Sequence, residues 1–322
     1  QEGGIRSFSS VDIDMSARSE SMGGNVISII DDDISLSQIA PSLLNKRMNN
    51  KMFFSFIDYF ADINLIGFAY IKRLQDVGVF SIGVRAIDYG DFEHNDEVGN
   101  NLGSFTAGDQ IITFGGSKIL SNYFTLGTNV NVINSQYEIY RAIALYSNTS
   151  LTYCKESFVS TLLVKNLGRQ LKSYTDIKED LPLDIQFSLS KELQHLPFRY
   201  VLTFHHLNKF NISSPYKLTS QTNFQTGELE IKDEGIAKTF LRHIIIGGEL
   251  NPFRKKIFFR GGLNFQRRFD MTLLTAPKLV GFSWGMGFSY SRFRFDYSRS
   301  AYHLSGYLNS FSITSNLNQI GL

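Results

Sequence analysis

The sequence predicts an all-β fold, a 14-stranded antiparallel transmembrane β-barrel with an N-terminal plug inside its lumen. Three observations predict it: stretches in which apolar and polar residues alternate, connections that alternate between short and long, and a first segment that fits neither pattern. Alternation is informative because successive side chains of a strand point to opposite faces. In residues 278–291, large apolar side chains alternate with Gly and Ser. This strand therefore has one apolar face and one face of small side chains.

The same alternation recurs along the chain, at the length of about ten residues that a tilted strand needs to cross a bilayer. The polar side of these stretches includes Arg and Asp, which lipid excludes but a watery or plugged lumen accepts. The pattern therefore predicts apolar side chains on the outside and polar ones on the inside. The clearest further examples are residues 124–132, 183–190, 198–205, 257–265 and 293–298.

Composition agrees with long strands and excludes several other classes. Phe (28) and Tyr (15) are abundant, whereas Pro (6), which removes a ladder donor, is scarce. No run of about eighteen apolar residues predicts a transmembrane helix. The net charge of +2 and the lack of a basic tract give nucleic-acid binding no electrostatic support. Cys154 is the only cysteine, so no intramolecular disulfide is expected. The chain shows no leader at Gln1 and is interpreted as a mature protein whose signal peptide has been removed.

The expected connections separate the barrel into two ends. Bacterial barrels have short periplasmic turns and long extracellular loops, and twelve of the thirteen expected connections follow this rule if both termini are periplasmic. The connection near Asp62 is the exception, because it is tight. The barrel is expected to span residues 51–322. Its strands are expected at 52–61, 63–74, 77–89, 108–120, 122–134, 142–153, 156–167, 182–193, 197–209, 239–250, 255–267, 277–290, 292–301 and 307–317.

Residues 1–50 are predicted to form the plug. The segment is rich in small residues and carries three consecutive acids, Asp31, Asp32 and Asp33, without the spacing of a calcium-binding EF-hand loop. A charge in the lumen is costly unless it is paired, so these acids are expected to bind inward arginines, and neutralising them is expected to loosen the plug. The candidate arginines are Arg85, Arg199, Arg260, Arg292 and Arg294, and further lumen charges are Asp184 and Asp296.

No catalytic, metal or cofactor motif occurs in the sequence, so a non-enzymatic protein without a cofactor is predicted. His205 and His206 are expected to face opposite sides of a strand, where they cannot hold one ion together. Aromatic residues in the two longest connections, 90–107 and 209–238, are candidate partner contacts, although the longer loop could equally be a lid over the barrel mouth. These residues are Phe92, His94, Phe105, Phe210, Tyr216 and Phe224.

Residues 16–45 resemble the hatch signature of the FadL-like outer-membrane family. The matching residues are Ala17, Arg18, Met22, Gly23, Gly24, Asp31, Asp32 and Pro41 to Leu44, although the family usually has Asn before the proline, where this chain has Ala40. Over its whole length the chain is similar to the PorQ-like branch of that family. The residues that suggest this branch lie at 58–64, 88–92, 96–100, 165–168 and 181–184.

The resemblance implies a non-catalytic anchor in the outer membrane of a Gram-negative bacterium of the Bacteroidota. In the type IX secretion attachment complex, its extracellular loops would hold a PorZ-like soluble surface protein, near PorU-like and PorV-like components, among outer-membrane lipid and lipopolysaccharide. The alternative that the family implies is transport of hydrophobic small molecules through a displaced hatch. Inward residues that are mostly Gly, Ser, Asn, Thr and Arg argue against an apolar conduit. A general porin is disfavoured because the plug would block it.

Overall fold

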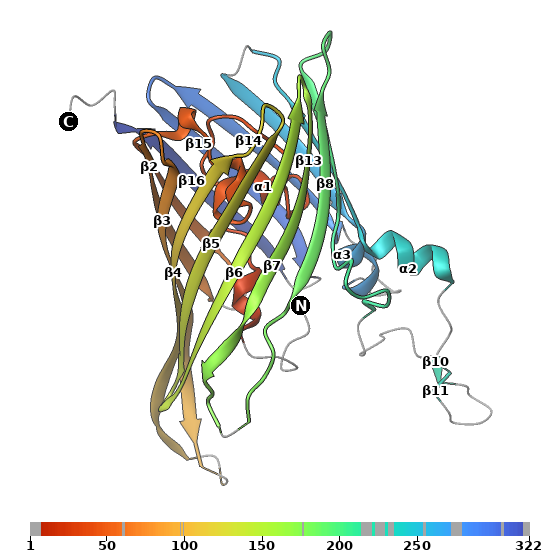
Figure 1. The fold of residues 1–322 in the computed structure, drawn as a ribbon. Helices are drawn as coiled ribbons and strands as arrows, with labels where there is room; N and C mark the ends of the chain where they lie inside the picture. Colours follow the sequence, from red (N-terminus) through yellow and green to blue (C-terminus); the bar gives the residue numbers. More distant parts are fainter. Residues whose placement is uncertain are drawn as a thin grey trace.

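The computed structural model describes residues 8–59, 62–96, 98, 100–175, 177–213, 221–222, 229–230, 235–253, 256–271, 279–303 and 306–317. Within these residues, fourteen antiparallel strands close into a barrel whose lumen holds the N-terminal segment (Figure 1). The predicted fold class is confirmed. No helix among the described residues combines the length and the apolar character needed to cross a membrane.

Each barrel strand pairs with its neighbour in sequence, β9 pairs with β12, and β1 pairs with β16 to close the wall. The excursion between β9 and β12 carries a small hairpin, β10 (Gln221–Thr222) and β11 (Leu229–Glu230), and the helix α2 (Ile236–Arg242). The wall strands are β1 (Lys51–Asp58), β2 (Asn64–Leu74), β3 (Gly78–Asn95), β4 (Asn101–Ile119), β5 (Phe124–Tyr137), β6 (Tyr140–Lys155), β7 (Phe158–Lys172), β8 (Asp184–Glu192), β9 (Phe198–Phe204), β12 (Ile244–Leu250), β13 (Ile257–Asn264), β14 (Phe282–Tyr290), β15 (Phe293–His303) and β16 (Gly306–Asn316).

The wall has the predicted two faces. On β14, Phe282, Trp284 and Met286 are each about half exposed on the outside, whereas Ser283, between them, is buried on the inside. The end at which β1 begins and β16 ends carries the short connections and is called the short-turn end. The opposite end carries the longest connections, such as those between β7 and β8 and between β9 and β12, and is called the long-loop end.

Several element boundaries differ from the prediction, and three of the differences change the shape of the barrel ends. Residues 90–107, expected as a loop, largely continue β3 and β4 as a projecting hairpin (Figure 1). Phe92 and Phe105 face each other across this ladder with ring centroids 5.4 Å apart, a cross-strand pair that stabilises the extension. On the other side of the barrel, α2 replaces the expected start of β12. The strand β13 ends at Asn264, whose side chain accepts a hydrogen bond from Arg267 N (3.1 Å) and caps the helix α3 (Phe265–Asp270).

The plug runs through the lumen from one end to the other. It contains the helix α1 (Ala17–Ser21) and four 3-10 turns, η1 (Ser9–Asp12), η2 (Leu36–Gln38), η3 (Pro41–Leu43) and η4 (Lys46–Met48). Phe8 packs on Tyr174 at the long-loop end (ring centroids 6.1 Å apart), whereas η4 leads into β1 at the short-turn end. Both termini were expected at the short-turn end. The end of β16 lies there, but the first described residues lie at the opposite mouth.

The small inward side chains of the wall make room for the plug backbone. A Cβ atom on Gly262 of β13 would overlap the backbone of Met22 and Gly23, and one on Gly127 of β5 would overlap Pro41. Gly23 itself has a φ of +98°, and a Cβ there would lie 2.7 Å from Ile245 Cγ2. The Met-Gly-Gly motif of the plug and Gly262 of the wall therefore pack directly against each other.

Replacing Gly262 by Val tests this contact. The substitution is expected to push α1 away from β13 and to lower the free energy of unfolding by about 1–3 kcal/mol, as overpacking of a tight interior does. Thermal unfolding in detergent and the rate of proteolysis within the plug would measure it.

The matched control is Gly261→Val, because a Cβ at Gly261 meets no atom closer than 3.9 Å. If both variants lose the same stability, or neither does, the proposed contact between glycine and plug does not hold the plug in place.

Candidate functional site

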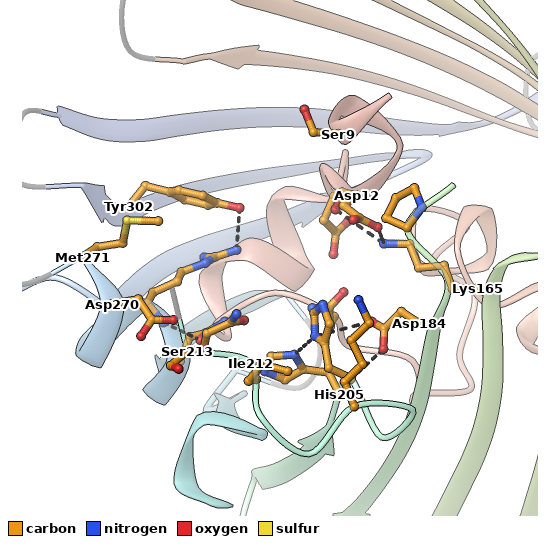
Figure 2. A pocket seen from close by; sticks show the side chains of 18 of the residues that line it. Ser9, Asp12, Lys165, Asp184, His205, Ile212, Ser213, Asp270, Met271 and Tyr302 are labelled. Atoms are coloured by element: carbon orange, nitrogen blue, oxygen red, sulfur yellow. Dashed lines mark hydrogen bonds and ion pairs between the residues drawn. The ribbon is translucent and has the colours of Figure 1, made fainter. Parts of the chain in front are cut away.

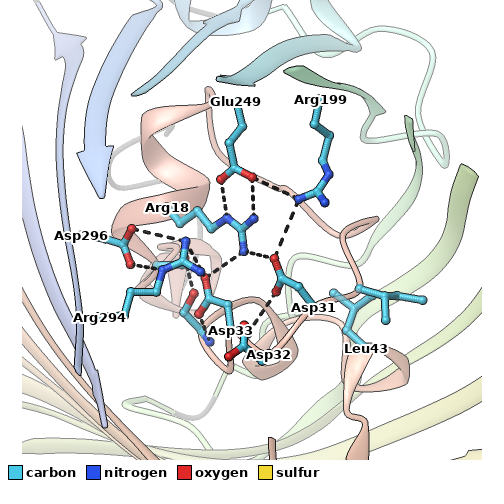
Figure 3. A network of polar contacts seen from close by, with 12 residues as sticks. Arg18, Asp31, Asp32, Asp33, Leu43, Arg199, Glu249, Arg294 and Asp296 are labelled. Carbon is cyan, nitrogen blue, oxygen red and sulfur yellow. Dashed lines mark hydrogen bonds and ion pairs between the residues drawn. The ribbon is translucent and has the colours of Figure 1, made fainter. Parts of the chain in front are cut away.

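Arg18, on the plug helix α1, is the centre of a buried ion-pair network (Figure 3). Its Nε and Nη2 atoms donate to the two carboxylate oxygens of Glu249 on β12, at 2.9 and 2.8 Å. Its Nη1 atom donates to Asp31 (2.7 Å) and Asp33 (3.1 Å) of the plug. The Arg18 side chain is 1% exposed, so its charge depends on these partners rather than on water. Arg18 thereby ties two parts of the plug to the barrel wall.

Glu249 extends the network along the wall. Its carboxylate also accepts from Arg199 of β9 (3.0 Å) and Arg260 of β13 (2.8 Å). Arg260 in turn donates to Asp296 of β15 (2.7 Å), which also accepts from Arg294 (2.9 Å). Four arginines thus face four carboxylates, and the formal charges balance. The members of this Arg18 network are Arg18, Arg199, Arg260, Arg294, Asp31, Asp33, Glu249 and Asp296.

Arg18 and Asp31 of the plug keep their ionised forms. Burial alone would lower the pKa of the Arg18 guanidinium, but Asp31, Glu249 and Asp33 raise it well above its ordinary value. Burial likewise acts to raise the pKa of Asp31, yet the charge of Arg18 holds it below the ordinary value. The plug is therefore attached to the wall by charge at any pH near neutrality.

The three consecutive acids separate into two roles. Asp31 lies 3.8 Å from Arg199, and Asp33 lies 3.7 Å from Arg294, two of the arginines suggested by sequence. Asp32 forms no ion pair with an arginine of the described residues: its side chain is 61% exposed and binds Lys51 of β1 at 2.6 Å. A substitution that loosens the plug is therefore expected to act through Asp31 and Asp33.

Other predicted lumen charges lie apart from this network. Arg85 donates to the Tyr146 hydroxyl (3.1 Å) and to the Ile13 carbonyl (3.4 Å). Arg292 lies against the ring of Phe293, 5.2 Å from its centroid. Asp184 accepts from the backbone of His206. Glu249 is not among the lumen charges predicted from the sequence, although it lies on the inward-facing parity of a Gly-rich strand.

Two of the cavities formed by the described residues lie at opposite ends of the plug. One, of about 280 Å³, lies toward the long-loop end and is called the long-loop cavity (Figure 2). The other, of about 750 Å³, is called the short-turn cavity, and members of the Arg18 network, among them Asp31, Arg199 and Glu249, line it. The network thus stands at the boundary between the plug and the short-turn cavity.

Eight of the twenty residues that line the long-loop cavity are charged. Lys165 of β7 binds Asp12 at 3.0 Å, and Arg267 of α3 binds Glu20 of the plug at 3.1 Å. Asp14, also from the plug, is buried there, and its pKa is raised to about 6, mainly by burial and next by the charge of Glu20. A channel for hydrophobic molecules would need an apolar pocket instead of these charged side chains.

His205 and His206 differ from the prediction. They follow the end of β9 at Phe204, and His206 has a φ of 55°, so the two rings turn toward each other instead of facing opposite sides. Their Nδ1 atoms are 2.6 Å apart. Burial and the neighbouring His206 hold the pKa of His205 well below its ordinary value, so its ring is neutral. In the described part of the chain, no group of three or more His, Cys, Asp or Glu residues is placed to hold a metal ion.

The candidate loop residues are placed only in part. Phe92, His94 and Phe105 lie on the projecting β3–β4 hairpin, where His94 Nδ1 is 3.6 Å from Glu138 Oε1 of the neighbouring connection. Phe210 is 65% exposed beside the long-loop cavity. Tyr216 and Phe224 lie outside the described residues.

The fold is similar to those of known outer-membrane channels. The Pseudomonas putida toluene transporter TodX matches with a TM-score of 0.50 and 12% identity, over 94% of this chain and 97% of that one. The CymD monoaromatic hydrocarbon channel matches with 0.49 and 11%, over 95% and 98%. A Pseudomonas aeruginosa FadL homologue matches with 0.42 and 10%, over 83% and 88%. No protein-family model and no curated protein matches the chain. The chain therefore shares its barrel fold with the toluene transporter TodX.

Replacing Glu249 by Gln tests the Arg18 network. Three arginines would lose their shared negative charge while the side chain keeps its shape, so the free energy of unfolding is expected to fall by about 3–5 kcal/mol. Thermal unfolding in detergent would measure the loss.

Glu192→Gln is the matched control, because Glu192 binds Arg199 with a side chain that is 49% exposed, and exposed pairs contribute about 0–1 kcal/mol. Equal stability of the Glu249→Gln variant and the unmodified protein would show that the network does not hold the plug.

Proposed function

We propose that the chain is a FadL-like transporter that passes small molecules across the outer membrane when its plug moves. The observation that carries this proposal is the pair of cavities on opposite sides of the plug, about 280 and 750 Å³ in volume. Non-covalent side-chain contacts hold the plug between them, so its displacement would join the two spaces. The similarity in fold to the toluene transporter TodX supports a channel of this type.

The Arg18 network suits a plug that is closed at rest and able to open. Separating a buried ion pair is costly, which keeps the plug in place. However, Arg199 and Asp31 are 17% and 21% exposed and line the short-turn cavity. Water in that cavity could solvate these charges as the plug leaves, which lowers the barrier to opening. The charged lining of the long-loop cavity favours polar or amphipathic cargo over hydrocarbons.

A reversible crosslink tests transport. Ser28 of the plug and Ser188 of β8 are joined by a hydrogen bond of 2.9 Å between their hydroxyl oxygens, so a Ser28→Cys, Ser188→Cys pair is placed to form a disulfide. In a Cys154→Ala background, oxidation is expected to abolish swelling of proteoliposomes in isotonic arabinose, ethanolamine hydrochloride or sodium glycolate, and a reductant to restore it.

Each single cysteine variant serves as a control for oxidation. Swelling that persists in the oxidised double variant, or that never exceeds the rate of protein-free vesicles in any of the three solutes, would contradict the proposed transport.

The second candidate function is that of an anchor for a soluble surface protein in a type IX secretion attachment complex. The observation that favours it is the β3–β4 hairpin, which projects past the rest of the wall (Figure 1). Phe92, Val98 and Leu102 on this hairpin are 42%, 87% and 63% exposed. Exposed apolar side chains on a projecting element are suitable interface anchors. The partner would be PorZ-like, with PorU-like and PorV-like components and lipopolysaccharide nearby.

Replacing residues 92–105 by an Asn-Gly turn tests the anchor. A soluble protein that copurifies in stoichiometric amount from native outer membranes in mild detergent is expected to be lost from the shortened variant, as mass spectrometry would show. The closed barrel below the hairpin should keep its thermal stability, which is the control for folding. Recovery of the unmodified barrel without any soluble partner would contradict the anchor.

A further inference from the structure

The long-loop cavity has an excess of carboxylates over cations. Five acidic side chains line it, against Lys165, Lys209 and Arg267. A side chain binds the carboxylate of four of the five acids: Lys165 binds Asp12, Arg267 binds Glu20, Arg242 binds Asp270, and Gln186 binds Asp184, which also accepts from the backbone of His206. The fifth acid, Asp14, accepts instead from the backbone of Ser16.

Asp14 is 4% exposed and only partly satisfied. Its Oδ1 atom accepts from Ser16 N at 2.9 Å, whereas its Oδ2 atom has no hydrogen-bond partner within the part of the chain that the structure describes. In the same cavity His205, 1% exposed, also has an unpartnered atom, Nε2, among these residues. Buried polar atoms without partners are rare and costly, so both atoms mark a place for a missing partner.

The local charge defines what that partner must carry. Burial and, next, the charge of Glu20 raise the pKa of Asp14 to about 6, although hydrogen bonds from Ser19 and Ser16 and the ammonium of Lys165 act to lower it. Lys165 itself is bound to Asp12. Asp14 is therefore ionised at pH 8, and no cation among the described residues forms an ion pair with it. A ligand that brings both a positive charge and a hydrogen-bond donor would satisfy it.

The other residues that line the cavity and its volume limit the size of the ligand and favour one with an apolar part. Pro182, Ile212 and Met271 add apolar surface beside the charged groups, and Figure 2 shows Ile212, Met271 and His205 around the same space. A volume of about 280 Å³ admits a small molecule and excludes a folded partner.

We propose that the long-loop cavity binds small molecules that carry a protonated amine on a short apolar body, with the ammonium donating to Asp14 Oδ2. The buried His205 Nε2, which has no partner among the described residues, is the second atom that a polar group of the same ligand would satisfy. If the chain is a transporter, this site identifies small amines as its cargo. Binding of an amine does not itself depend on transport, but the role of the amine as cargo does.

Calorimetry on the purified full chain in detergent at pH 8 tests the site with three probes of similar shape: benzylamine, benzyl alcohol and benzoate. Benzylamine is expected to bind at least about tenfold more tightly than either of the others. Asp14→Asn is expected to weaken benzylamine binding by about tenfold or more, because the charge-assisted hydrogen bond becomes a neutral one. The substitution keeps the shape of the side chain and removes a buried charge, and thermal unfolding would confirm that the variant folds.

Asp91→Asn, on the exposed part of β3, is the matched control and should leave binding unchanged. No preference for benzylamine, no binding of benzylamine, or equal binding by the Asp14→Asn variant would overturn the site. Failure of this site is distinct from failure of transport. Amine binding without swelling of proteoliposomes would contradict transport alone, whereas swelling without amine binding would contradict the site alone.

Discussion

The buried contact between Arg18 and Glu249 is the constraint on which the rest of the structure depends. An arginine taken out of water inside a lumen must find carboxylates, and Arg18 finds one on the wall and two on the plug. Because Glu249 is shared with Arg199 and Arg260, the same contact also joins three neighbouring strands, β9, β12 and β13. The same set of ion pairs therefore fixes both the position of the plug and the arrangement of the charged side chains on the inner wall.

The polar side chains on the inner face of the barrel form hydrogen bonds with the plug. The plug has little regular structure, so many of its backbone groups need partners from outside the segment. Side chains of the wall supply several of them: Ser150 accepts from Ser42 N at 2.9 Å, and Asn129 donates to the Gln38 carbonyl at 2.9 Å. Glycines of the wall supply the space for this approach. An irregular segment is thus held in one conformation by a regular one.

A shared barrel does not determine what the protein passes or holds, because function resides in the lining of a site. The fold is similar to that of a toluene transporter, yet the long-loop cavity contains Asp12, Asp14, Glu20 and Lys165, groups that favour polar ligands over hydrocarbons. The projecting β3–β4 hairpin is a separate feature on the same scaffold. The two proposed functions, a channel and an anchor, therefore rest on different regions of the chain.

The sequence by itself determined the barrel, its fourteen strands and the inward direction of its charges, because the alternation of a strand is local and repeats every two residues. It also indicated that Asp31 and Asp33 would meet arginines. It did not indicate that Arg18 would bind Glu249, 231 residues away, or that Asp32 would bind Lys51 instead. It predicted that His205 and His206 face opposite sides of a strand, whereas in the structure β9 ends before them and their rings meet. Only the closed barrel decided these pairs, because which residues meet across a lumen depends on strand register, on where each strand ends and on the path of the plug.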